Sequence, residues 1–177
     1  MRMLAATAFA LAMAATPAFA QDTAPEKKFD GPYVAVIGGI EEAGNTSTGN
    51  EGAIYGGAVG YDHQAGKLVV GIEGEATGST TRHCVSSICT DSGRDLYAGA
   101  RVGYVVGGRT MLYAKAGYDN AEVGLPMGKR KLDGVRVGGG VETNLTGRAF
   151  VRAEYRYSDL QQDAHKQQGT VGVGLRF

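Results

Sequence analysis

The chain contains no tryptophan, and it has only four prolines, three histidines and two cysteines among its 177 residues. Its formal net charge at pH 7 is zero, so it lacks the strongly basic character of nucleic-acid-binding proteins. After residue 20 it also lacks any apolar run long enough for a transmembrane helix. If such a chain resides in a membrane, it must cross as a closed β-barrel, because open sheet edges leave backbone groups unpaired in lipid.

Glycine is abundant instead, with 29 residues that follow no collagen period and lie inside apolar alternations rather than in linkers. The alternation is clearest at the end of the chain, where Val171, Val173, Leu175 and Phe177 share one face of an extended strand. Such a strand, ending on an aromatic residue, is typical of the last strand of a bacterial outer-membrane β-barrel, with lipid on one face and a polar lumen on the other.

The N-terminal segment has the features of a secretory signal peptide. Residues 1–20 contain one positive charge, Arg2, then an apolar stretch from Leu4 to Ala15, and they end in a small-x-small cleavage pattern. We expect cleavage after residue 20. Residues 21–30 are polar and are predicted to form a flexible periplasmic lead, and residues 31–177 are predicted to form one barrel domain.

Eight later segments alternate and are each near the length that a tilted strand needs to cross a bilayer. They are Gly31–Ile40, Gly52–His63, Gly66–Gly78, Arg94–Gly107, Arg109–Asn120, Lys131–Thr143, Gly147–Ser158 and Gln168–Phe177. Three connections are tight, and four are long: Glu41–Glu51, Ser79–Gly93, Ala121–Arg130 and Asp159–Gln167. Short periplasmic turns and long outer loops predict an all-β, eight-stranded, antiparallel up-and-down barrel.

The strand phases place charged side chains on the inner face, where the lumen of an eight-stranded barrel is just wide enough for side chains to fill it. Opposite charges confined there should pair, because an unpaired buried charge is costly. The predicted lumen cluster consists of Glu73, Glu75, Arg101, Lys115, Arg136, Arg152 and Glu154. We expect salt bridges among these residues to close the lumen.

Outward aromatic residues gather near the strand ends and predict two girdles at the membrane interfaces. The periplasmic girdle would contain Tyr33, Tyr61, Tyr104 and Phe177, and the outer girdle Tyr55, Tyr118, Tyr155 and Tyr157. The first strand is apolar on both faces, so its phase is the least constrained.

Cys84 and Cys89 lie close together in an exported chain, which favours a disulfide within the Ser79–Gly93 loop. Together with His83 they would be too few ligands for a closed metal site, and neither a metal nor a cofactor is expected. Loops on a rigid scaffold commonly carry recognition, so this loop is the expected contact surface.

Catalysis is not expected. The histidines are His63, His83 and His165, and the one candidate constellation places Ser158 and His165 near Asp159 and Asp163. Its spacing matches no hydrolase motif, and polar loop residues of this kind are usually solvated. A lipid-modifying barrel enzyme is therefore the least favoured function.

Three segments, Tyr113–Tyr118, Gly134–Glu142 and Val151–Ser158, resemble the small outer-membrane β-barrel family of alphaproteobacteria, the opacity-type or porin-family proteins. The architecture is similar to the OmpA transmembrane domain. The resemblance implies outer-membrane localisation, contact with outer-membrane lipid, and recognition of the C-terminal strand (Val171, Val173, Leu175 and Phe177) by the barrel-assembly machinery.

Two classes of function stay open. The first is a monomeric structural and surface-interaction protein that displays its loops to an extracellular ligand or a host surface. The second is a narrow, low-conductance porin that uses the charged lumen.

Overall fold

The computed structural model describes residues 28–45, 48–80, 82–85, 88–125, 128–145, 148–160 and 164–177. The predicted signal peptide and residues 21–27 lie outside these ranges, so the signal peptide stays a prediction. No helix in the described part of the chain is long and apolar enough to cross a membrane.

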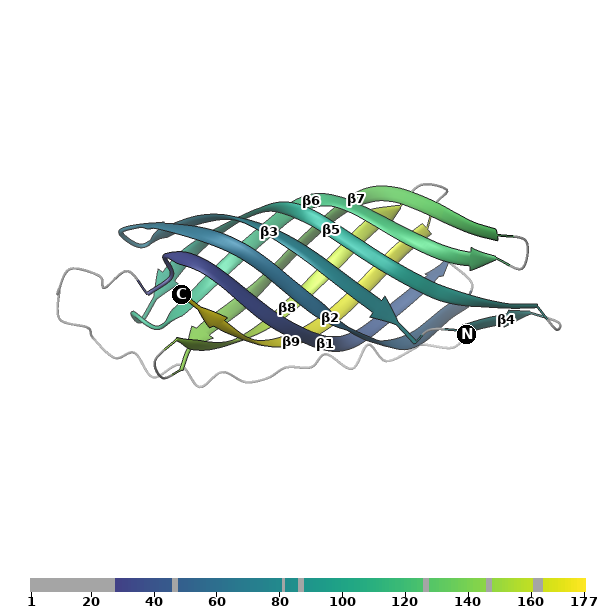
Figure 1. Cartoon of the computed structure of the whole chain (residues 1–177), viewed down its shortest axis with the longest axis horizontal. Coiled ribbons are helices and arrows are strands. Elements are labelled where there is room, and N and C mark those ends of the chain that lie inside the picture. Colours follow the sequence, from purple (N-terminus) through teal and green to yellow (C-terminus); the bar gives the residue numbers. More distant parts are fainter. Residues whose placement is uncertain are drawn as a thin grey trace, which may run out of the picture.

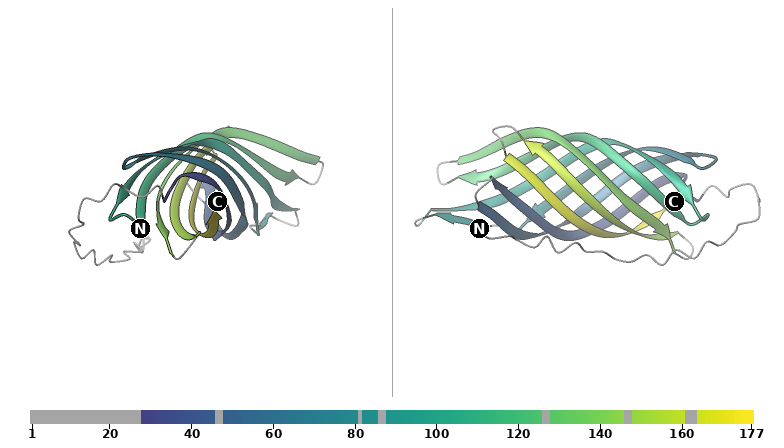
Figure 2. Two further views of the ribbon diagram at one scale, coloured as in Figure 1. Left: turned by 60° about the vertical axis from the view of Figure 1, so that its left-hand side comes forward. Right: turned by 180° about the vertical axis from the view of Figure 1, so that it is seen from behind.

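The described residues form nine strands. They are β1 (Gly31–Asn45), β2 (Thr48–Ala65), β3 (Leu68–Ser79), β4 (Arg82–Val85), β5 (Ile88–Val106), β6 (Thr110–Leu125), β7 (Gly128–Asn144), β8 (Ala149–Leu160) and β9 (Ala164–Arg176). Eight of them pair in the order β3-β2-β1-β9-β8-β7-β6-β5, and pairing of β3 with β5 closes the sheet. All of these neighbours are antiparallel, so the predicted eight-stranded barrel is confirmed (Figures 1 and 2).

The two ends of the barrel differ. β1 starts and β9 ends at one end, on the left of Figure 1, where tight turns also join β2 to β3 and β5 to β6. Gly66, Gly107 and Gly108 adopt positive φ angles of 65°, 63° and 74° in these turns, a conformation that suits glycine. We call this the turn end and the opposite end, on the right of Figure 1, the hairpin end.

The hairpin end contains more strand than the sequence predicted. The β1–β2 ladder continues to the pair Asn45 and Thr48, and the β6–β7 ladder continues to Leu125 and Gly128. The predicted long loops at 41–51 and 121–130 are therefore mostly paired strand. Apolar alternation ends where the outward face leaves its apolar surroundings, whereas a backbone hydrogen-bond ladder does not need apolar side chains to continue.

A further strand, β4, was missed by the sequence analysis within the predicted Ser79–Gly93 loop. β4 pairs only with the start of β5, and this hairpin projects beyond the barrel (Figure 1). The register places Cys84 directly opposite Cys89. Their side chains are outside the described part of the structure, so the disulfide stays a prediction.

Side chains alternate between the lumen and the outer wall along each strand. On β3, Ile72 is 66% exposed on the outer wall, whereas its neighbour Glu73 is buried in the lumen. On β9, Val171, Val173 and Leu175 face outward, as predicted for the C-terminal strand. A shift of one residue in register would move every lumen charge to the outer wall, so the charges themselves fix the pairing.

The prediction for Tyr33 is wrong. Its side chain is 1% exposed and lies in the lumen, whereas Tyr61, Tyr104, Phe177, Tyr55, Tyr118 and Tyr155 face outward and Tyr157 is half-buried on the outer wall. Because β1 is apolar on both faces, alternation does not set its phase. The Tyr33 hydroxyl donates instead to Glu73 Oε2 at 2.7 Å inside the barrel.

The abundant glycines make room for such inward rings. Tyr33 lies opposite Gly60, and a Cβ atom at Gly60 would come within 2.3 Å of the Tyr33 Oη atom. Phe150 lies opposite Gly174 in the same way, where a Cβ atom would come within 2.3 Å of the ring. Each ring covers a glycine on the neighbouring strand, which fills the lumen without widening the barrel.

Candidate functional site

The lumen is the candidate functional site, and the structure brings the seven residues of the predicted cluster together inside it. All seven side chains are buried: Glu73, Glu75, Arg101, Lys115, Arg136, Arg152 and Glu154. The alternation of β3, β5, β6, β7 and β8 turns them inward. Eight further charged residues are buried with them: Glu41, Asp62, Asp95, Asp119, Glu142, Arg156, Lys166 and Arg176.

The first layer of ion pairs lies nearest the turn end and forms a closed ring of two arginines and two carboxylates. Arg101 donates through Nε to Asp62 Oδ1 at 2.8 Å and through Nη1 to Glu142 Oε2 at 3.2 Å. Arg176 donates to the same two carboxylates, each at 2.7 Å. The four side chains come from β2, β5, β7 and β9, so this ring connects strands around the whole barrel.

The central layer surrounds Lys115. Its Nζ atom lies 2.8 Å from Glu73 Oε1, 2.6 Å from Glu75 Oε1 and 2.7 Å from Glu154 Oε1. Arg152 pairs with Glu73 and Glu75 from the β8 side. A neighbouring arginine on β8 also contacts two of the three carboxylates, and this layer therefore holds three cations and three anions.

That neighbouring residue is Arg156, which contacts Glu75 at 2.9 Å and also pairs with Glu154. Phenol hydroxyls complete the layer, since Tyr113 donates to Glu154 Oε2 at 2.6 Å. The rings also cover the cations, with the Lys115 Nζ atom 4.8 Å from the centroid of Tyr97. The charged groups are therefore paired and hydrogen-bonded, as buried charges require.

The three central carboxylates lie close enough together to resemble a metal site, because their ligand oxygens are within 4.8 Å of one another. The ammonium group of Lys115, however, contacts all three at hydrogen-bond distance. A lysine already supplies the positive charge that a metal ion would bring, and the arrangement gives no reason to invoke one.

The third layer lies toward the hairpin end. Arg136 donates to Asp95 at 2.6 Å and to Asp119 at 2.8 Å, and its Nε atom donates to Ser158 Oγ at 3.0 Å. Lys166 lies 2.6 Å from Asp95 and 3.7 Å from Glu41. Glu41 and Lys166 were missed as lumen residues, because both fall in segments that were predicted to be loops.

The layers are almost neutral as a set. Among the buried side chains described, eight carboxylates face seven cationic groups. The first two layers each balance, so the one excess carboxylate belongs to the layer near the hairpin end. Lys67, Arg109 and Arg148, which the strand phases also placed inward, are instead exposed at the turn end.

The candidate catalytic constellation is not brought together. Ser158 is buried in the lumen against Arg136, whereas His165 is exposed on the outer wall, where it stacks on Tyr157. Ser158 and His165 therefore lie on opposite faces of the sheet. His165 Nδ1 contacts the Tyr157 hydroxyl at 2.8 Å and lies 3.6 Å from Asp159, so it has no serine nucleophile beside it.

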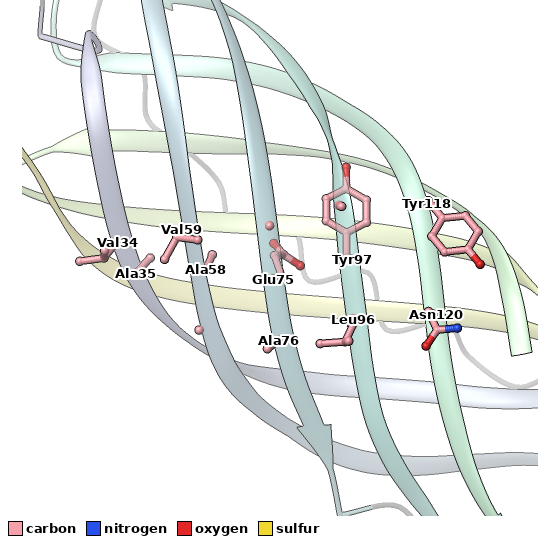
Figure 3. Close-up of a pocket in the computed structure, with 13 residues that line it drawn as sticks. Val34, Ala35, Ala58, Val59, Glu75, Ala76, Leu96, Tyr97, Tyr118 and Asn120 are labelled. Carbon is pink, nitrogen blue, oxygen red and sulfur yellow. The ribbon is translucent and has the colours of Figure 1, made fainter. Parts of the chain in front are cut away.

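The largest hollow that we describe lies on the outer wall rather than in the lumen. It measures about 810 Å³ and spans β1, β2, β3, β5 and β6 (Figure 3). Exposed apolar side chains such as Val59, Ala76 and Leu96 line it. Small residues on β2 and β3 next to larger ones on β5 and β6 account for its shape, and an apolar solvent would fill it.

Curated relatives agree with this architecture. The chain is 30% identical over 122 residues to the 25 kDa outer-membrane immunogenic protein of Brucella ovis, a match that covers 67% of this chain and 60% of that protein. It is 28% identical over 134 residues to the protein of the same name from Brucella canis, covering 67% and 62%. The chain thus spans about 60% of the length of the curated relatives that it matches.

Solved structures share the fold. Neisserial surface protein A has a TM-score of 0.61 at 19% identity, with 84% of this chain and 98% of that chain covered. Ail of Yersinia pestis, solved in complex with the heparin analogue sucrose octasulfate, also has a TM-score of 0.61 at 19% identity, with 84% and 99% covered. Both are eight-tenths or more matched by this barrel, which confirms the fold.

The family match is the most extensive of these comparisons. Residues 6–177 match the family described as the outer membrane protein beta-barrel domain. The short turns then face the periplasm, so the turn end is the periplasmic end, the hairpin end is the outer end, and the outer wall faces lipid. The predicted resemblance and localisation are confirmed: this chain belongs to the outer membrane protein beta-barrel domain family and resides in the bacterial outer membrane.

Proposed function

We propose that this protein is a closed outer-membrane barrel that serves as a structural and surface-interaction protein, and that it is not an enzyme. The observation that carries this proposal is the layering of the lumen, where ion pairs at three levels occupy the space between the strands. A barrel filled in this way is a rigid mount. What it offers to the outside is the set of hairpins at its outer end.

The β4–β5 and β6–β7 hairpins are the proposed contact surfaces for an extracellular ligand or a host surface. β7 begins with the run Lys129, Arg130 and Lys131, directly after the β6–β7 tip. A cluster of basic residues at an exposed tip favours an anionic ligand. The crystallised complex of Ail with a heparin analogue makes a sulfated glycan the first ligand class to test.

A direct test is binding of heparin-coated beads by cells that display the full chain. Replacing Lys129, Arg130 and Lys131 together with serine is expected to reduce bead binding at least about tenfold, with the loss largest at low salt because exposed charges are screened. The matched control replaces Lys67, Arg109 and Arg148, the three basic residues exposed at the periplasmic end, and should bind as the parent does. Equal binding by both triple variants would refute this surface as the site.

We further propose that the protein functions as a monomer without a cofactor and that the barrel-assembly machinery engages β9. The outward row of Val171, Val173, Leu175 and Phe177 supports this last proposal. A narrow porin is the second candidate function. The excess carboxylate in the outermost layer favours it, since a lumen with net negative charge at its outer end would admit cations.

A further inference from the structure

Phe29 is buried in the periplasmic mouth of the barrel, although it precedes the first strand. Its side chain is 0% exposed and packs in a cluster with Val69, Val105, Met111 and Tyr113. The sequence analysis placed Phe29 in a flexible lead, which is wrong for residues 28–30. A single apolar residue in a polar segment gives no periodic signal, so only the closed barrel shows where the ring lies.

Backbone and side-chain contacts hold this short segment on several strands. The Phe29 amide donates to Gln64 Oε1 at 2.9 Å, and the Gln64 amide donates to Asp30 Oδ1 at 2.8 Å. On the far side of the mouth, Asn144 Nδ2 donates to the Lys28 carbonyl at 3.1 Å. Gln64 ends β2 and Asn144 ends β7, so residues 28–30 reach across the opening rather than along its rim.

The segment also contacts the first layer of ion pairs. Arg176 Nη1 donates to the Phe29 carbonyl at 3.4 Å, and the Arg176 guanidinium lies 5.8 Å from the centroid of the Phe29 ring. The ring therefore covers the closed ring of Asp62, Arg101, Glu142 and Arg176 from the periplasmic side. It shields these charges from water where the lumen opens.

Gly31 turns the chain back toward the mouth. Its φ of +108° is strained for any residue with a side chain, and a Cβ atom there would come within 2.4 Å of the Phe177 carbonyl oxygen. A backbone that only glycine adopts well therefore sits between Phe29 and β1. The local sequence Phe29-Asp30-Gly31 supplies a buried ring, an anchoring carboxylate and the required turn.

We propose that residues 28–30 form a cork, in which the Phe29 ring seals the periplasmic mouth as a barrier in series with the ion-pair layers. The cork is a feature of the periplasmic end and is independent of the hairpins that the proposed function uses. Two barriers in series have a definite consequence: disrupting lumen charges alone leaves the mouth closed, and removing the ring alone leaves the ion pairs in place.

The test is the reactivity of a cysteine placed under the cork. Met111→Cys is introduced into the full chain with Cys84→Ser and Cys89→Ser, and a membrane-impermeant cationic thiol reagent is added to the protein refolded in phospholipid vesicles. We expect the thiol to be unreactive while Phe29 is present, because buried cysteines are inert. Phe29→Ala should increase its labelling rate at least about tenfold. Heat-modifiable gel migration verifies that each variant is folded.

Phe150→Ala is the matched control, because Phe150 is an equally buried phenylalanine that packs on Tyr33 but belongs to β8 rather than to the cork. With Phe29 in place, this control should leave the thiol unreactive. If Phe29→Ala does not fold, Gln64→Ala releases the anchor while keeping the ring and should also increase labelling. Labelling that is fast with Phe29 present, slow without it, or equally fast in the Phe150→Ala control would overturn the proposal.

Discussion

Replacing Lys115 with methionine is expected to destabilise the folded barrel by about 3–5 kcal/mol, the usual cost of leaving a buried charge without its partner. The Lys115 ammonium lies within 2.8 Å of three carboxylates that the barrel holds close together. Without it, Glu73, Glu75 and Glu154 carry three negative charges against two arginines. The methionine has a similar volume, so the effect reports the missing charge rather than a cavity.

The measurement is urea unfolding of the refolded chain in phospholipid vesicles, with stability taken from the midpoint and slope. Lys67→Met is the matched control, because Lys67 is exposed in the periplasmic turn and its loss should change stability by less than about 0.5 kcal/mol. Adding Glu154→Gln to Lys115→Met should recover part of the lost stability. A cost below about 1 kcal/mol for Lys115→Met would mean that water or ions already compensate these carboxylates.

Val137→Arg is the second substitution with a large expected effect. Val137 faces lipid near the middle of β7, and an arginine at the bilayer midplane costs about 2–4 kcal/mol on the outer wall of a barrel. Its neighbour Arg136 is fully buried and paired in the lumen. The same side chain is therefore stabilising at one position and destabilising at the next, which is the direct consequence of alternation.

The same vesicle unfolding experiment measures this cost. Leu145→Arg is its control, because Leu145 is exposed in the turn after β7, where an arginine near the interface costs about 0–1 kcal/mol. The difference between the two variants should disappear in a short-chain detergent that leaves the outer wall hydrated. Equal stability of both variants in vesicles would place Val137 outside the hydrocarbon region and would contradict the assigned strand phase.

Much of this fold follows from the sequence for a simple reason. In strands such as β8, Arg152 and Glu154 alternate with Val151 and Ala153, so only one register keeps charges out of lipid. That constraint sets the phase of each charged strand and therefore the composition of the lumen. Where a strand has no charge to restrain it, as around Tyr33 on β1, both phases are compatible with the pattern and the prediction failed.

The pairing of individual charges could not be predicted in the same way. Arg156 contacts Glu75, a residue 81 positions away, because pairing of β3 with β5 closes the sheet and brings β8 across the lumen from β3. Such partners depend on barrel diameter and strand stagger, which no local pattern contains. The extension of strands beyond the lipid-facing zone was hidden for a related reason, since polar residues on both faces give no alternation.

Single-channel recording of the refolded chain, residues 21–177, in a planar bilayer tests most directly whether the lumen is closed. Heat-modifiable gel migration would first establish that the barrel is folded. With ion pairs at three levels and Phe29 across the periplasmic mouth, we expect no conductance steps at moderate voltage. Reproducible steps whose size changes on Lys115→Ala or Arg152→Ala would contradict a closed barrel and would identify the protein as a narrow porin.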